Sequence, residues 1–224
     1  MIIIPMIRAL LIDLDDTILC ETMAMKSAIN SLVFNKFAHF QLISLADTDN
    51  SLFDIWGKAS SSYWQQYIDG EISFQQQRQL RVRALFGAHI SDQAANTIFD
   101  DYLTLYESYW TAAPGCELFM IKTASIPKVL VTNGNKEQTI QKLKKLHLFE
   151  CFSAIFTAEE FAAKPNPAIF NAALKTLNCA PEDALMIGDD ELTDIAPAKR
   201  LGMHTFQVSI NNPNQSLLNA LSLI

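Results

Sequence analysis

The chain has 224 residues, of which 50% are hydrophobic and 18% are charged, and its formal net charge at pH 7 is -7. This composition supplies enough apolar side chains for a packed core and argues against an intrinsically disordered chain. The length favours a core domain that carries a large insertion, because it exceeds one small domain and falls short of two full ones. A net negative chain lacks the basic balance that nucleic-acid binding generally needs, so we expect no nucleic acid polymer as partner.

The sequence indicates neither a membrane anchor nor an oxidising compartment. No apolar run reaches the roughly 18 residues of a membrane span. The apolar opening segment, residues 1–7, lacks the basic leader and the small-residue cleavage site of a signal peptide. The four cysteines are widely scattered, with no C-x-x-C pair and no histidines at zinc spacing. We therefore expect a soluble cytoplasmic protein with reduced cysteines and no membrane partner, and the oligomeric state stays open.

The first predicted element is a short strand that ends in a cluster of acids. The apolar residues 10–12 run into Asp13, Asp15 and Asp16, which are followed by Thr17. Carboxylates a few ångströms apart repel one another in a partly dehydrated site, so such clusters protonate, pair with cations or bind a divalent metal. A phosphoryl-transfer site that binds a hard cation is the leading interpretation. A strand that ends in a solvated acidic turn is the alternative.

The next region, residues 20–110, predicts a helical insertion. No run of β-branched residues stands out in it. Large side chains recur instead at a helical spacing, at Ile98, Tyr102, Leu105 and Tyr109. After a break at residues 69–70, Ser73 and Gln76 form a capping-box pattern that predicts the start of another helix.

From about Pro114 onward, short apolar runs alternate with helical patterns, which is typical of a parallel sheet built from βαβ units. The predicted strands are residues 128–132, 153–157, 184–188 and 204–208. One predicted helix runs through Leu146, a second has Asn166 as its N-cap and Pro167 at its first position, and a third ends near Gly202. The predicted fold class is therefore α/β, a doubly wound parallel sheet with an inserted helical domain.

The helix that runs through Leu146 carries a local cluster of lysines. The cluster consists of Lys136, Lys142, Lys144 and Lys145. We interpret it as the ordinary solvated face of a helix rather than as a binding patch.

Polar residues at four separate places each suit one role in phosphoryl transfer. The four places are Asp13 with Asp15, Thr132 with Asn133, Lys164, and the run Gly-Asp-Asp-Glu-Leu-Thr-Asp at 188–194. Each has an ordinary explanation when it is taken alone, such as a turn, a solvated loop lysine or an acidic helix start. Ligands bind at the carboxyl ends of strands in open α/β sheets, so we expect these places to meet in space.

In this order the pattern resembles the haloacid dehalogenase superfamily of aspartate-nucleophile phosphotransferases. The matching motifs are D-x-D-x-T at 13–17, Thr-Asn at 132–133, Lys-Pro at 164–165 and the acidic run at 188–194. The resemblance implies a Rossmann-like catalytic core made of residues 1–19 and 111–224. It also implies that residues 20–110 form a helical cap, because the insertion falls where this family carries its first-position cap.

The resemblance implies a role for each matching residue. Asp13 would be the nucleophile that forms an aspartyl phosphate. Asp15 would protonate the leaving alkoxide and would later activate water. Thr132, the amide of Asn133 and Lys164 would bind the oxygens of the phosphoryl group.

The resemblance further implies a Mg²⁺ cofactor held by oxygen ligands. Asp13 and Asp189 would bind the ion through their carboxylates, and Asp15 would face it with its backbone carbonyl. Asp194 would complete the site, either directly or through water. Thr17 would brace the turn that carries the acids.

The function implied is Mg²⁺-dependent hydrolysis of a small phosphomonoester. The acid at position 15 disfavours the dehalogenase branch of the superfamily, which does not keep an acid/base Asp there. A phosphomutase with the same nucleophile stays open, as does a non-catalytic phosphoryl-receiver or binding module.

The substrate is left open among a nucleotide, flavin mononucleotide and a sugar phosphate. Residues 20–110 hold 15 of the 22 aromatic residues of the chain. We interpret these aromatic side chains as the core of the helical insertion. Stacking against a nucleobase or a flavin ring is the alternative.

Overall fold

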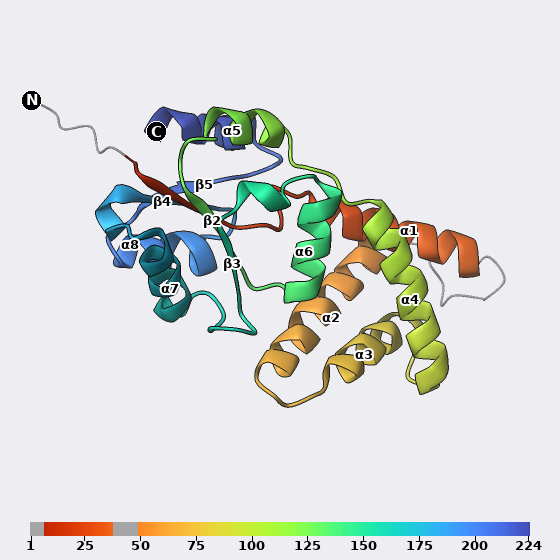
Figure 1. Cartoon of the computed structure of the whole chain (residues 1–224). Coiled ribbons are helices and arrows are strands. Elements are labelled where there is room, and N and C mark those ends of the chain that lie inside the picture. Colours follow the sequence, from red (N-terminus) through yellow and green to blue (C-terminus); the bar gives the residue numbers. More distant parts are fainter. Residues whose placement is uncertain (1–6, 38–48) are drawn as a thin grey trace, which may run out of the picture. The chain divides into compact units, whose positions relative to one another are not determined.

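The computed structural model describes residues 7–37 and 49–224 of the chain (Figure 1). These residues form two compact units. The first consists of the chain up to Glu21 together with Trp110–Ile224, and the second of Thr22–Tyr109. Most of the predicted opening segment, residues 1–6, lies outside the described residues. Within the described ranges, no helix combines the length and the apolar character needed to cross a membrane.

The first unit is built on a parallel sheet of five strands in the order β3-β2-β1-β4-β5. The strands are β1 (Ala9–Ile12), β2 (Lys128–Thr132), β3 (Ala154–Thr157), β4 (Ala184–Gly188) and β5 (His204–Gln207). The three central strands are buried throughout, as expected for parallel strands that are covered on both faces. The strand order reverses between β1 and β4, and ligands bind in open α/β sheets at such a switch point.

Helices cover both faces of this sheet. The helices are α5 (Cys116–Lys122), α6 (Lys136–Lys145), α7 (Pro167–Leu177) and α8 (Ala196–Arg200), with two short 3-10 helices, η1 (Phe149–Cys151) and η2 (Pro181–Asp183), between them. α7 packs against β2 and β3, and α8 packs against β5. α5 and the C-terminal 3-10 helix η5 (Leu217–Leu223), which follows η4 (Pro213–Gln215), pack together on the opposite side of the sheet (Figure 1). The predicted doubly wound α/β class is confirmed.

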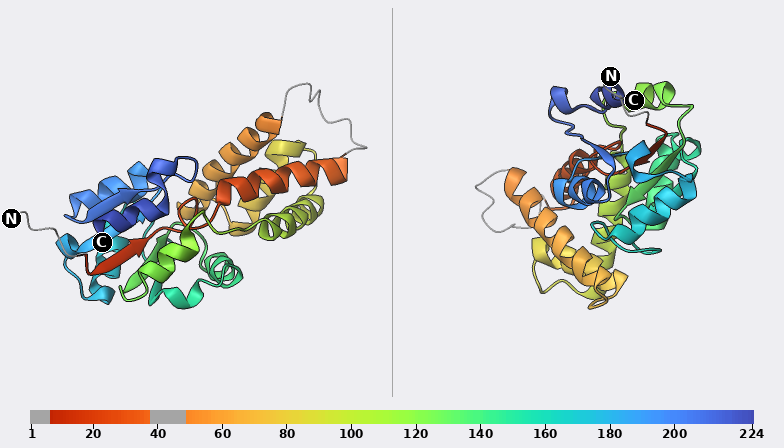
Figure 2. Two further views of the ribbon diagram at one scale, coloured as in Figure 1. Left: turned by 90° about the horizontal axis from the view of Figure 1, so that it is seen from above. Right: turned by 90° about the vertical axis from the view of Figure 1, so that its left-hand side faces the viewer.

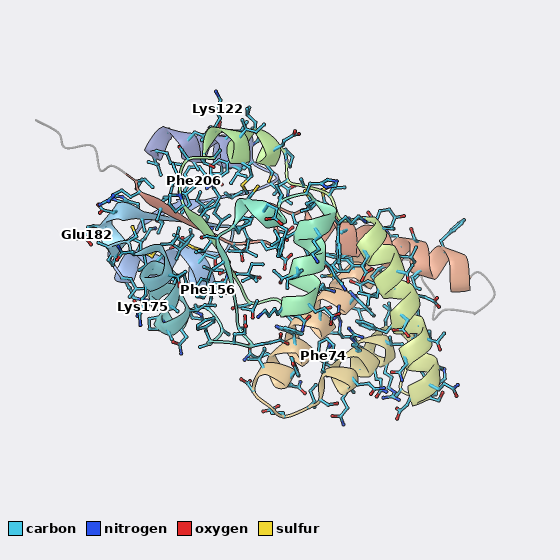
Figure 3. The ribbon with its side chains drawn as sticks, in the orientation of Figure 1. Phe74, Lys122, Phe156, Lys175, Glu182 and Phe206 are labelled. Atoms are coloured by element: carbon cyan, nitrogen blue, oxygen red, sulfur yellow. The ribbon has the colours of Figure 1, made fainter. Side chains whose placement is uncertain are left out.

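The core between the sheet and α7 follows from the alternation of side chains along the strands. Leu11 of β1, Met186 of β4 and Phe170 of α7 belong to one buried apolar cluster. Phe156 of β3 joins this cluster, whereas Lys175, on the other face of α7, points into solvent (Figure 3). The sheet is thereby held as a rigid platform for the residues that follow its strands.

The local signals that predict these elements are present in the structure. β2 and β4 have the predicted bounds, and the three other predicted strands each differ by one residue at one end. Asn166 caps α7 by accepting a hydrogen bond from the N–H of Ala168, and Pro167 is the first helical residue. The helix predicted to end near Gly202 is α8, but it is preceded by a turn of π-helix, η3 (Glu191–Ile195), that no pattern in the sequence predicts.

The second unit is helical, as predicted for the insertion. Its helices are α1 (Glu21–Phe37), α2 (Asp49–Ile68), α3 (Phe74–Phe86) and α4 (Asp92–Ser108). α3 packs against both α2 and α4 (Figure 2). The capping box of Ser73 and Gln76 is formed at the start of α3. The assignment of residues 20–110 as a cap domain stays a prediction.

α4 is a helix, as the spacing of Ile98, Tyr102, Leu105 and Tyr109 predicts. Its buried residues are Ala95, Phe99, Tyr102 and Tyr106, so Tyr102 alone of those four is among them. Tyr109 is the C-cap residue and is exposed. The ring of Tyr102 packs against Phe99 of the same helix and Trp56 of α2.

Aromatic rings build the core of the second unit. The ring of Trp56 lies 4.5 Å from that of Tyr102 and 6.1 Å from that of Phe99, measured between centroids. For these residues the core interpretation is confirmed. Two of the fifteen aromatic residues, Phe37 and Phe40, fall outside the described side chains.

Candidate active site

The end of β1 delivers Asp13 to the carboxyl edge of the sheet. Its N–H donates to the carbonyl of Ile187 in β4 at 2.9 Å, which extends the strand pairing by one residue and fixes the direction of its side chain. The chain then turns at Asp16, whose φ of 56° is more accessible to Asp than to most residues. Thr17 braces this turn as predicted, because its Oγ1 donates to Oδ2 of Asp13 at 3.1 Å.

Lys164 joins two carboxylates that are far apart in the sequence. Its Nζ lies 2.6 Å from Oδ1 of Asp13 and 2.6 Å from Oδ1 of Asp194. All three side chains are buried, at 3%, 6% and 1% exposure respectively. Burial by itself lowers the pKa of the Lys164 ammonium, but the charges of Asp13 and Asp194 outweigh it and hold that pKa above its usual value. The site therefore contains a permanent positive charge.

The loop after β2 holds the lysine in place. Asn133 accepts a hydrogen bond from the backbone N–H of Lys164 at 2.7 Å and donates one to its carbonyl at 3.0 Å. Because the side chain of Asn133 is bound to this backbone, its predicted role toward phosphate rests on its own backbone N–H. Thr132, at the end of β2, accepts a hydrogen bond at Oγ1 from the N–H of Gly134 at 3.0 Å.

The run after β4 brings two further acids to Asp13. Among the described residues, oxygens of Asp13, Asp189 and Asp194 lie within 4.8 Å of one another. Gly188 permits this approach, since a Cβ at that position would lie 2.3 Å from Oδ2 of Asp194. Asp190 supports the turn of π-helix by accepting hydrogen bonds from the N–H groups of residues 192 and 193.

The electrostatics of this acidic group favour a divalent cation. Burial, followed by the charges of Asp13 and Asp194, raises the pKa of Asp189 to about 7. Burial and repulsion from Asp13 raise the pKa of Asp194 to about 6, although Lys164 acts in the opposite direction. Three carboxylates surround one lysine, so when they are all ionised their negative charge exceeds what Lys164 offsets. An all-oxygen donor set of this kind fits Mg²⁺.

Asp15 lies apart from that acidic group and has its own lysine. Oδ1 of Asp15 lies 2.6 Å from Nζ of Lys142, which is also 3.3 Å from Oε2 of Glu21. Burial, followed by the charge of Glu21, holds the pKa of Asp15 well above its usual value, although Lys142 acts in the opposite direction. Because the carboxylate of Asp15 is paired with Lys142, its predicted contact with a metal rests on its backbone carbonyl.

The interpretation of Lys142 as part of a solvated helix face is wrong. Lys136, Lys144 and Lys145 are exposed as expected, but the side chain of Lys142 is only 3% exposed. It lies on the buried face of α6 with Thr139 and Leu143. The spacing of these residues by three and four positions was the signal that could have identified Lys142.

Comparison with known proteins places this chain in one family. The chain belongs to the haloacid dehalogenase-like hydrolase family, whose model matches residues 7–202. The chain is 26% identical over 204 residues to the glyceraldehyde 3-phosphate phosphatase of Pyrococcus furiosus, a match that covers 89% of this chain and 79% of that protein. The predicted family and the prediction of a hydrolase are confirmed.

Solved structures share the fold across nearly the whole chain. The magnesium-bound structure of the HAD hydrolase YfnB from Bacillus subtilis superposes with a TM-score of 0.73 at 24% identity, over 91% of this chain and 89% of that one. L-2-haloacid dehalogenase from Xanthobacter autotrophicus gives a TM-score of 0.69 at 15% identity, over 97% and 83% of the two chains. At these identities the likeness establishes the fold alone.

Proposed function

We propose that this chain is a Mg²⁺-dependent phosphatase that hydrolyses a small phosphomonoester through an aspartyl phosphate on Asp13. The observation that carries the proposal is the pair of acids after β1. Asp13 is fixed between Thr17 and Lys164, and Asp15 follows two residues later with a raised pKa. The name of the relative from Pyrococcus furiosus supports a phosphomonoester as the class of substrate.

In the first step Asp13 attacks the phosphorus atom of the substrate. Hydrogen bonds from Thr17 and Lys164 restrain both oxygens of its carboxylate, which orients the nucleophile before the substrate arrives. The bond between phosphorus and the leaving oxygen breaks as the bond to Asp13 forms. Asp15 donates its proton to the leaving oxygen, and the raised pKa of its carboxyl favours the protonated form that this step needs.

In the second step water releases the phosphoryl group. Asp15, now ionised, accepts a proton from water, whose oxygen attacks phosphorus. The bond between phosphorus and Asp13 breaks, inorganic phosphate leaves, and both acids return to their starting state. Lys164, Thr132 and the backbone N–H of Asn133 bind the phosphoryl oxygens in both steps.

The acidic group supplies the metal site of this proposal. Asp13, Asp189, Asp194 and the backbone carbonyl of Asp15 would hold Mg²⁺, which when bound neutralises part of the negative charge of phosphate and carboxylates. Without it Asp13 would face a phosphate dianion beside two further acids. The requirement for a cation follows from that repulsion.

A phosphomonoester panel tests the proposal. We expect release of inorganic phosphate from at least one of glyceraldehyde 3-phosphate, a nucleoside monophosphate, flavin mononucleotide and a hexose phosphate. We expect that activity to be lost on addition of EDTA, to return with Mg²⁺, and to be absent in Asp13→Asn. Turnover that persists in Asp13→Asn, or that is indifferent to EDTA, contradicts the proposal.

The same assay separates the two alternatives. A phosphomutase retains the phosphoryl group on a bisphosphorylated product, so a sugar phosphate would disappear without equivalent release of inorganic phosphate. A phosphoryl receiver would be labelled once without sustained turnover. The family match favours a hydrolase over a receiver. The free cysteines suit a reducing compartment, and we propose the cytoplasm.

A further inference from the structure

The buried lysine of α6 has no part in the steps described above. Nζ of Lys142 lies 2.6 Å from Oδ1 of Asp15 and 3.3 Å from Oε2 of Glu21. The ring of Trp110 lies 5.8 Å from the same Nζ atom. Taking an ammonium out of water is costly, and this cost is offset only when its carboxylate partners are held in good geometry.

Lys142 lies on α6, the helix that follows the loop that would bind phosphate. α6 begins at Lys136, directly after residues 132–135, and Asn135 caps it by accepting a hydrogen bond from the N–H of Gln138. Lys142 is therefore carried by a short, capped helix that starts at the candidate phosphate loop. The Lys142 side chain is only 3% exposed and its ammonium is bound by both Asp15 and Glu21, so its position restrains Asp15.

The two oxygens of Asp15 face different surroundings. Oδ1 contacts Lys142, whereas Oδ2 lies 3.7 Å from the position that a Cβ on Gly134 would occupy. Gly134 belongs to the loop in which Thr132 and Asn133 would bind the phosphoryl group. With Oδ1 bound to the ammonium, Oδ2 is the oxygen that faces this loop.

We infer that Lys142, anchored by Glu21, is a positioning residue that holds Asp15 with Oδ2 directed toward the leaving-group oxygen of the substrate. The inference rests on the proposed function, in which Asp15 is the general acid. Lys142 acts through Asp15 and does not itself touch the substrate. Its loss therefore matters most where the leaving group needs a proton.

The test compares two leaving groups in Lys142→Met. 4-Nitrophenolate leaves 4-nitrophenyl phosphate with little need for an acid. The alkoxide of glyceraldehyde 3-phosphate, or of the best alkyl phosphate of the panel above, is a poor leaving group that needs a proton. We expect kcat/KM for the alkyl phosphate to fall by about 10- to 100-fold, as for a misplaced acid, and kcat/KM for 4-nitrophenyl phosphate to fall by less than about threefold. The comparison uses kcat/KM because this ratio covers the steps up to departure of the leaving group and excludes the later attack of water, which also needs Asp15.

Two variants on the same helix serve as controls. Lys145→Met removes a cation that lies 5.8 Å from the same Trp110 ring, and it is expected to leave both substrates unaffected. Lys142→Arg retains the charge and is expected to restore part of the alkyl phosphate activity. If Lys142→Met does not fold, Glu21→Gln is used instead, because it weakens the ion pair that holds Lys142. We then expect kcat/KM for the alkyl phosphate to fall by about 3- to 10-fold and kcat/KM for 4-nitrophenyl phosphate to change little.

A double variant distinguishes positioning from a general structural role. In the background of Asp15→Asn, Lys142→Met should cause no further loss with the alkyl phosphate, because the acid that it positions is already absent. An equal loss of kcat/KM with both substrates, or a full further loss in that background, overturns the inference. If the wild-type enzyme hydrolyses no phosphomonoester, the proposed function fails, and this inference fails with it.

Discussion

The side-chain amide of Asn133 forms two hydrogen bonds with the backbone of Lys164, a residue 31 positions later in the chain. Asn133 directly follows β2, and Lys164 lies in the loop after β3. These bonds fix the stretch of chain from which the lysine side chain reaches Asp13 and Asp194. The residue after β2 thereby fixes the position of the Lys164 ammonium, which contacts the acids that follow β1 and β4.

This relationship predicts that Asn133 is required for activity even if its side chain never touches phosphate. In Asn133→Ala the backbone of Lys164 loses both partners, and its ammonium moves relative to Asp13. We expect kcat/KM to fall by about 100-fold, the scale of a misplacement of about 1 Å, and the free energy of unfolding to fall by about 1–3 kcal/mol. Steady-state kinetics and urea unfolding measure the two effects.

Asn135→Ala is the matched control for this prediction. It removes an asparagine side chain from the same loop, one that caps α6 and donates to Glu159 at 2.9 Å. We expect a similar loss of stability, about 1 kcal/mol, with much less effect on kcat/KM. Equal activity losses in the two variants would show that the contact with Lys164 has no special importance.

Gly188 is predicted to be intolerant of even one extra methyl group. In Gly188→Ala the new Cβ would lie 2.3 Å from Oδ2 of Asp194, so the carboxylate has to move away from Lys164. We expect a loss of about 1–3 kcal/mol in the free energy of unfolding and at least a 100-fold loss of activity. A variant Gly57→Ala is the control, because nothing lies within 4 Å of a Cβ at that position. Full activity of Gly188→Ala would contradict the placement of Asp194.

Binding of Mg²⁺ is predicted to weaken as the pH falls. The pKa of Asp189 is about 7 and that of Asp194 is about 6 without a metal, so near pH 6 the acidic group still holds a proton that Mg²⁺ has to displace. Between pH 7 and pH 6 we expect the affinity to fall by up to about tenfold, and more steeply below pH 6 as a second proton is retained. Titration calorimetry from pH 5.5 to pH 8 measures this slope.

The direction of this effect follows from the sign of the pKa shifts. The surroundings of both acids raise their pKa values. Protons therefore compete with Mg²⁺ at a higher pH than they would at an exposed Asp. In Asp189→Asn one titrating group is removed, and the slope between pH 7 and pH 6 should flatten along with a weaker affinity. A Mg²⁺ affinity that stays constant from pH 5.5 to pH 8 is incompatible with an ion bound by these acids.

Most of the core fold was predictable because its signals are local. β2 and β4 are continuous apolar runs bounded by polar residues, and Asn166 with Pro167 marks the start of α7 whatever the tertiary context. The meeting of Asp13 with Lys164 was also predictable, since parallel strands bring their carboxyl ends to one edge.

Features that depend on packing between distant segments escaped the sequence analysis. Lys142 resembles its exposed neighbours in sequence, and its burial depends on Asp15 and Glu21, more than 120 positions earlier in the chain. The buried face of α4 depends on the ring of Trp56 in another helix. The π-helical turn after β4 places Asp194 beside Gly188, and no spacing rule for α-helices anticipates it.

Transfer of a phosphoryl group to Asp13 is tested most directly by trapping it. Acetyl phosphate suits this test because acetate departs without help from an acid, whereas release of the group from Asp13 needs Asp15 to activate water. Asp15→Asn incubated with [³²P]acetyl phosphate and Mg²⁺ and then quenched in acid should retain label that hydroxylamine removes. The double variant Asp13→Asn/Asp15→Asn should retain none, and equal labelling of the two proteins would contradict the account.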